Sequence, residues 1–185
     1  MANWYNDQVT NKNFLSPIGF IFILDKARKV SFLCQKAEIP ELSLSSIDIP
    51  TAGFAPIPMG GNTINYGDLN LEFIVDEDLK NYMEIHNWIR ALGTPQNMKE
   101  RSDWYKTWER DWGDRREGRF SDATLQVLNN NNIVNFDVLF KNLFPISLST
   151  VPFDVTGSDN AYFTANASFE YMLYEVRDKN SQKRR

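Results

Sequence analysis

Runs in which apolar and polar residues alternate dominate this 185-residue sequence. The clearest is LNLEFIV (69–75), in which every second residue is apolar. A period of two is typical of a strand that buries one face. Similar runs recur at 41–50, 121–128, 133–140 and 161–176. We therefore expect a mainly β fold of about seven strands, an antiparallel β-sandwich or barrel.

One stretch has helical spacing instead. In LKNYMEIHNWIRALG (79–93) the apolar residues recur every three or four positions, and Gly93 and Pro95 end the pattern. Asp76 or Asp78 can cap the helix, because a carboxylate there accepts unpaired backbone amides. We expect this single helix to pack against the sheet.

Two hairpins are predicted. IGFIFIL (18–24) and VSFLCQKA (30–37) are separated by a short polar turn, and the strands 121–128 and 133–140 are separated by four asparagines. A break in the alternation at Ser45–Ser46 predicts a β-bulge.

The segment 50–67 reads as a long loop or arm, because its prolines lack amide donors and its glycines permit positive φ. Such a segment either folds back onto its own core or lies against a partner. Its apolar and proline residues are the candidates for that contact: Phe54, Pro56, Ile57, Pro58 and Met59.

Three tryptophans, Trp104, Trp108 and Trp112, form one helical stripe in the highly charged insert 96–120. Either this is a surface helix that rests on the body through its tryptophans, or it docks another chain or stacks on sugar rings. Residues 1–14 form a polar N-terminal segment, and 177–185 a basic tail. The whole of 1–185 is expected to be one domain.

Composition narrows the class of protein. The sequence is 42% hydrophobic, enough for a real core, and its formal net charge of -4 argues against a general nucleic-acid binder. A single cysteine, Cys34, excludes an intrachain disulfide and fits a reducing cytoplasm. The apolar run 18–24 is too short to span a bilayer, so we expect a soluble, unexported chain.

Signatures of catalysis are scarce. His86 is the only histidine, which excludes a multi-histidine metal site, and no phosphate loop or nucleophile elbow is present. Carboxylates such as Asp137, Asp154 and Glu175 leave a paired-carboxylate glycosidase as a remote alternative. We expect no enzyme activity, no cofactor and no metal.

Several segments, taken in order, carry a resemblance to a known family. They are FLCQKAEIP (32–40), NYGDLNLEFIVDE (65–77), a helix bearing Trp88, FKNLFP (140–145) and ASFEYMLYEV (167–176). This ordered set resembles the tail tube proteins of T4-like contractile-tailed bacteriophages. The insert 98–119 and the tail after Val176 depart from that pattern.

The resemblance implies a β-sandwich subunit that forms hexameric rings, stacked head to tail into a hollow tube. Such a tube lies inside a contractile sheath on a baseplate, in the virion, and conducts the genome without binding it specifically. Assembly would take place in the host cytoplasm. An acidic chain suits a conduit for DNA, because like charge keeps the phosphates mobile.

The resemblance suggests a contact in the tube for each of three segments. The long strand 162–176 is expected to be an edge that pairs with a neighbouring copy. The arm 50–67 is the candidate for ring-to-ring contact, and the three tryptophans are the candidate for contact with the sheath. The alternatives are a baseplate tube initiator or cap of the same fold and, from another class, a carbohydrate-binding β-sandwich module.

Overall fold

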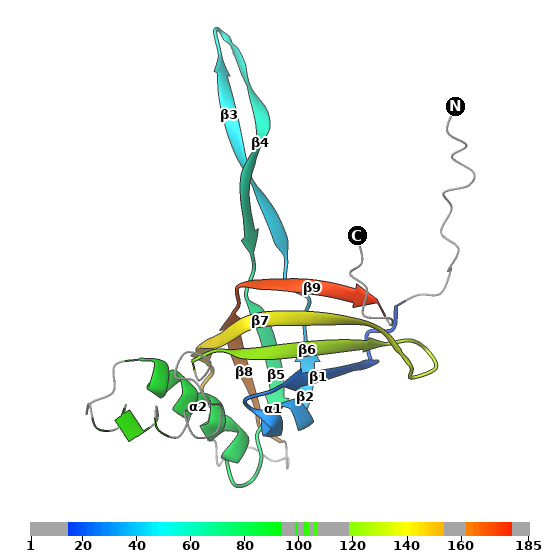
Figure 1. Cartoon of the computed structure of the whole chain (residues 1–185), viewed down its shortest axis with the longest axis vertical. Coiled ribbons are helices and arrows are strands. Elements are labelled where there is room, and N and C mark those ends of the chain that lie inside the picture. The colour runs from blue at the N-terminus through cyan, green and yellow to red at the C-terminus, as the bar shows by residue number, and fades with distance from the viewer. Residues whose placement is uncertain are drawn as a thin grey trace.

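A computed structural model describes residues 15–93, 119–153 and 162–178 and the single positions 99, 102, 103 and 106. This part of the chain holds nine strands and two helices, so the expectation of a mainly β, antiparallel fold is confirmed (Figure 1). In chain order they are β1 (Phe20–Leu24), α1 (Arg28–Phe32), β2 (Cys34–Ala37), β3 (Leu42–Thr51), β4 (Phe54–Tyr66), β5 (Leu69–Ile74), α2 (Lys80–Leu92), β6 (Ser121–Leu128), β7 (Val134–Leu148), β8 (Thr164–Glu170) and β9 (Leu173–Asp178).

The long strand β7 belongs to two antiparallel sheets. Its first part pairs with β6 and β9, and its last part pairs with β8. One sheet therefore has the order β1-β6-β7-β9 and the other the order β2-β5-β8-β7. Asn142, in the left-handed region at φ 55°, lies near the end of the first part, two residues before the pairing with β8 begins at Phe144.

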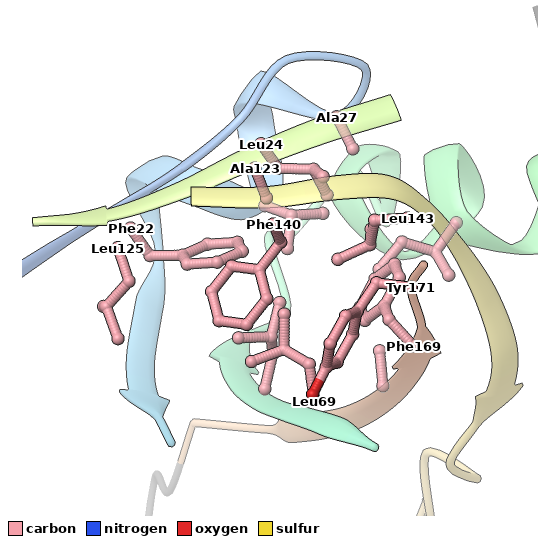
Figure 2. Close-up of a cluster of buried hydrophobic side chains, with 14 of the residues drawn as sticks. Phe22, Leu24, Ala27, Leu69, Ala123, Leu125, Phe140, Leu143, Phe169 and Tyr171 are labelled. Atoms are coloured by element: carbon pink, nitrogen blue, oxygen red, sulfur yellow. The ribbon is translucent and has the colours of Figure 1, made fainter. Parts of the chain in front are cut away.

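The core lies between these sheets, and the alternation of the sequence supplies it. In β5, Leu69, Leu71 and Phe73 are buried, whereas Asn70 is exposed. The same core cluster contains Phe140 and Leu143 from β7, Phe169 from β8 and Tyr171, which follows β8 (Figure 2). Each fully buried large apolar side chain contributes about 1.5–3 kcal/mol to stability.

Helix α2 occupies nearly the range expected from its spacing. Its N-cap residue is Leu79, which makes no capping hydrogen bond through its side chain. Asp76 nevertheless accepts an amide of the first turn, as expected: its Oδ1 accepts a hydrogen bond from the backbone N of Asn81, 3.1 Å away. The fully buried Asn81 donates in turn to the carbonyl of Ile74 at 2.7 Å. Asp78 pairs with Lys80 instead. The first turn of α2 is thereby fixed to the end of β5.

The predicted hairpin across 18–37 is wrong. Strand β1 pairs with β6, β2 pairs with β5, and α1 lies between them. The connection has no Gly, Asn or Pro to form a tight turn, and a helical turn there buries Ala27 and Val30 in the core. The Ser31 hydroxyl accepts a hydrogen bond from the backbone N of Leu24 at 2.7 Å and holds this turn against β1.

The second predicted hairpin is confirmed. Strands β6 and β7 pair directly, and Asn132 in the turn adopts a φ of 57°, which asparagine tolerates. The Asn129 side chain accepts hydrogen bonds from the backbone N of Asn131 and of Ile133, at 2.9 and 3.0 Å. Local turn chemistry therefore fixes this connection.

The single long strand expected over 161–176 is two strands, β8 and β9, separated at Tyr171–Met172. They pair with different parts of β7, which lie in different sheets, so one straight strand could not reach both. Strand β8 lies between β5 and β7. The expectation that all of 162–176 is an edge is therefore wrong, and within it only β9 has an open side.

Candidate interaction surface

Strands β3 and β4 form a two-stranded hairpin that projects from the body (Figure 1). Within the described residues they pair only with each other. The segment 50–67, expected to be a loop, is thus mostly strand. The prolines fit because β4 is an edge strand, and Pro56 lies at the register shift between Ile49 and Thr51, where a proline is tolerated.

The hairpin carries an apolar surface that its own subunit leaves uncovered. Paired residues share a face, so Ile47 lies beside Met59 and Ile49 beside Ile57. Every large apolar side chain of the ribbon is more than a third exposed: Leu42, Leu44, Ile47, Ile49, Phe54, Ile57, Met59, Ile64 and Tyr66. Asp48 is the only charged residue between positions 42 and 66.

The hairpin tip is a two-residue turn that presents Phe54. Thr51 pairs with Phe54, and Gly53 in the turn has a φ of 81°, a conformation that favours glycine. The Thr51 hydroxyl lies 2.9 Å from the carbonyl oxygens of Phe54 and Ala55. The Phe54 side chain is 83% exposed. A defined turn therefore holds a large aromatic ring in solvent.

A bulge interrupts the ribbon where the sequence predicts one. The pairing shifts between Leu44 and Ser46. Ser45 at this shift accepts a hydrogen bond from the backbone N of Thr63 at 3.3 Å, and Gly61 lies close against it. A bulge increases the local twist, so it directs the outer half of the hairpin.

One hydrogen bond closes the root of the hairpin, and another attaches it to the body. The backbone N of Gly67 donates to the carbonyl of Glu41 at 3.0 Å, and the Tyr171 hydroxyl donates to the carbonyl of Gly67 at 2.8 Å. Tyr66 packs edge-on against Tyr171 and Tyr174. The root is therefore continuous with the core, and the outer hairpin is not.

A groove of about 610 Å³ lies beside this root. Its walls come from 64–66 of the hairpin, from Phe120, from Asn142 and Phe144 of β7, and from 170–172. Phe120 and Phe144 meet edge to face, with ring centroids 5.8 Å apart. The sequence gives little sign of this groove, because four distant segments build it.

Edges of the sheets offer a second kind of contact. Among the described residues, β1, β2 and β9 each have one pairing partner. An edge strand has unpaired backbone groups along one side and can extend a sheet into another chain. Outside the hairpin, the described residues therefore have three strands available for pairing between copies.

The remaining candidates offer little chemistry. The described residues contain no group of three or more His, Cys, Asp or Glu side chains that could hold a metal ion. His86 lies 3.5 Å from the Asn87 side chain, and burial raises the pKa of the Cys34 thiol to about 11. Both described helices fall short of what a membrane span requires.

One predicted site is not described. Trp104, Trp108 and Trp112 all lie outside the described residues, so their contact with a sheath stays a prediction. The candidates Phe54, Pro56, Ile57, Pro58 and Met59, by contrast, are brought together on the outer half of the hairpin.

Comparisons with known proteins agree with this architecture. A family model described as phage tail tube protein matches residues 8–177. No curated protein matches the sequence.

Several solved structures have a similar fold. A chain of the anti-feeding prophage tube-terminating cap is 18% identical, with a TM-score of 0.63, over 96% of this chain and 99% of that one. A chain of the PVC sheath/tube terminator is 15% identical, with a TM-score of 0.61, over 90% and 99%. A chain of the PVC sheath-tube complex is 14% identical, with a TM-score of 0.55, over 90% and 93%. At these identities the likeness concerns the fold.

Proposed function

The chain belongs to the phage tail tube protein family, and we propose that its copies form hexameric rings that stack head to tail into a hollow conduit for the genome. Family membership gives it a structural role in a tail tube. The ring, the stacking and the passage of the genome are our proposal.

The observation that carries the proposal is the uncovered hairpin β3–β4. An isolated two-stranded hairpin is at best marginally stable in water. Here the outer half of such a hairpin exposes Ile47, Ile49, Ile57 and Met59. A patch of this kind on a protein surface marks an interaction site. Contact with the next ring would cover it, and Phe54 would be its outermost group.

The open strands support the ring. Strands β1, β2 and β9 each have one free side in the described structure, and pairing with neighbouring copies would satisfy their backbone groups. A closed ring removes such edges altogether. The net charge of -4 suits a wall past which DNA moves without adhering.

We further propose that the chain has no enzymatic activity, that it meets sheath and baseplate proteins in the virion, and that the tube assembles in the host cytoplasm. The three tryptophans of the insert 96–120 are the candidate contact with the sheath.

Negative-stain electron microscopy of the purified protein over a concentration series tests the proposal. Rings of uniform diameter that lengthen into tubes as concentration rises are the expected result. Single rings that never stack would instead indicate a cap or tube initiator. A monomer at every concentration, even with a baseplate fraction added, would contradict the proposal.

A further inference from the structure

The two ends of the hairpin have complementary surfaces. Its tip presents Phe54, and its root forms one wall of the groove described above. We infer that this root groove receives the hairpin tip of a second copy, with Phe54 as the anchoring side chain. The inference rests on the proposed tube and identifies the site at which one ring receives the next.

A tip cannot enter the groove of its own chain. Phe54 and Ile64 are ten residues apart on β4, about 30 Å at the rise of an extended strand. Strand β3 pairs with β4 on both sides of the bulge, so the ribbon cannot fold back on itself there. The tip and the groove can therefore meet only between copies. Such a head-to-tail contact leaves a new tip and a new groove at the two ends of every assembly, so it propagates.

The chemistry of the groove suits an aromatic anchor. Phe120 and Phe144 already meet edge to face, and Tyr66 of β4 lines the same groove. A third ring can join them in the same geometry. Phe120 and Met172 are 41% and 65% exposed, so an inserted ring would cover apolar surface on both partners.

Charge does not oppose the contact. Glu170 is the one carboxylate in the groove lining, together with the neutral Asn65 and Asn142. The tip brings no charge of its own, because Asp48 lies opposite Pro58 and the turn at 51–55 is uncharged. No like charges are therefore brought together when the tip enters.

The hairpin brings apolar area to the contact. Seven large apolar side chains of the hairpin outside the groove are about half exposed. At ~100 Å² for a whole side chain they offer on the order of 400 Å². The groove supplies a smaller area, so a single contact is small, and stacking would depend on the contacts of all copies in a ring acting together.

Disulfide trapping between copies tests the inference. A chain carrying both Phe54→Cys and Met172→Cys is oxidised at pH 8, at a concentration well over tenfold above that at which the parent protein assembles, because loss of the Phe54 ring weakens the contact. Cys34 can stay, because burial raises the pKa of its thiol to about 11 and leaves little thiolate. We expect a ladder of covalent multimers on a non-reducing gel.

Three controls make the result specific. Phe54→Cys alone must give no ladder, since a dimer from this variant would mean that tips meet tips. Met172→Cys alone must also give none. Phe54→Cys combined with Asp78→Cys, an exposed position at the start of α2, must not give one either.

The outcomes separate the groove from the tube. If tubes form but no ladder appears, the groove is not the contact, although the proposed tube is unaffected. The same conclusion follows if the Phe54/Asp78 cysteine pair gives a ladder as strong as that of the Phe54/Met172 pair. A disulfide within one chain would also overturn the groove. The absence of both rings and ladder would overturn the proposed function, and the groove with it.

A non-covalent variant gives an independent readout. Phe54→Ala should raise the concentration needed for tube formation about tenfold or more, as expected for a central anchor. Phe153→Ala is the matched control, because Phe153 is 80% exposed and lies outside the hairpin. Equal effects of the two substitutions would overturn the inference.

Discussion

Gly61 of β4 lies directly against Ser45 of β3: a Cβ on Gly61 would be 2.9 Å from the Ser45 carbonyl oxygen. The neighbouring Gly60 is different, because a Cβ there would meet Leu44 at 3.7 Å, an ordinary contact. The close approach of the two strands at the bulge therefore requires glycine at position 61 and does not require it at position 60.

We expect Gly61→Ala to loosen the outer hairpin and leave the core unchanged. The added methyl group would collide with the Ser45 hydroxyl and also with the Ser45 backbone, which cannot swing aside, at a cost of about 1–3 kcal/mol. Hydrogen exchange should quicken about tenfold or more over 42–66, and not over β5 or β8. Gly60→Ala is the control and should exchange like the parent. Equal loss of protection in the core would contradict the prediction.

Tyr171→Phe is expected to destabilise the hairpin root. The substitution removes the hydrogen bond from the hydroxyl to the Gly67 carbonyl and keeps the ring that packs on Tyr66. Loss of one such bond costs about 1 kcal/mol, which lowers Tm by roughly 2–4 °C in a chain of this size. Calorimetry of Tyr171→Phe beside Tyr162→Phe, whose ring is exposed, checks this. Equal Tm values would contradict it.

Lys26 should make stability depend on pH. Its ammonium group lies 5.1 Å from the centre of the Trp88 ring and 3.2 Å from the Phe120 carbonyl oxygen. Burial lowers its pKa from 10.5 to about 8. Between these values the unfolded chain binds more protons than the folded one, so the free energy of unfolding attributable to Lys26 rises with pH.

Urea unfolding at pH 7.5 and 9.5 measures this effect. Lys26→Met keeps the apolar stem and cannot titrate, so subtracting its values cancels other groups such as Cys34. We expect the difference, parent minus variant, to rise by about 1 kcal/mol, less than the full shift implies because Lys26 is partly solvated. A difference that stays constant or falls with pH would contradict the assignment.

Local patterns predicted those elements whose causes are local. Three such elements depend on residues close in sequence: the strand 69–75, the asparagine turn before β7, and the hydrogen bond that Asp76 accepts from the first turn of α2. The hairpin 18–37 failed because β1 takes its partner from β6, about a hundred residues away. Alternation of apolar and polar residues predicts that a segment is a strand, but it does not predict which strand pairs with it.

The candidate site divides in the same way. The apolar residues of 50–67 predicted a contact surface. The glycines and prolines of the same segment predicted a loop, whereas it is mostly strand, because Gly61 fits a bulge and the prolines fit an edge strand. The groove could not be predicted, since 64–66, 142–144 and 170–172 meet only through the two-sheet topology.

We expect the outer hairpin to be needed for stacking and not for the stability of the fold, and a truncated chain tests this. Deleting 53–62 removes the tip and the apolar pairs of the outer half, while the root hydrogen bonds of Gly67 remain. Because the outer hairpin packs on nothing else in the described structure, we expect Tm to change by less than about 3 °C. Tubes should be lost, because the stacking contact is gone, while rings should still form through the sheet edges.

A second variant keeps the ribbon at full length and removes only its apolar character. Ser in place of Ile47, Ile49, Ile57 and Met59 should likewise give rings without tubes in negative-stain images, because the area that stacking buries is lost. Long tubes from either variant would show that stacking uses another surface. Loss of the folded core, seen as a collapse of Tm, would show that the hairpin belongs to the fold itself.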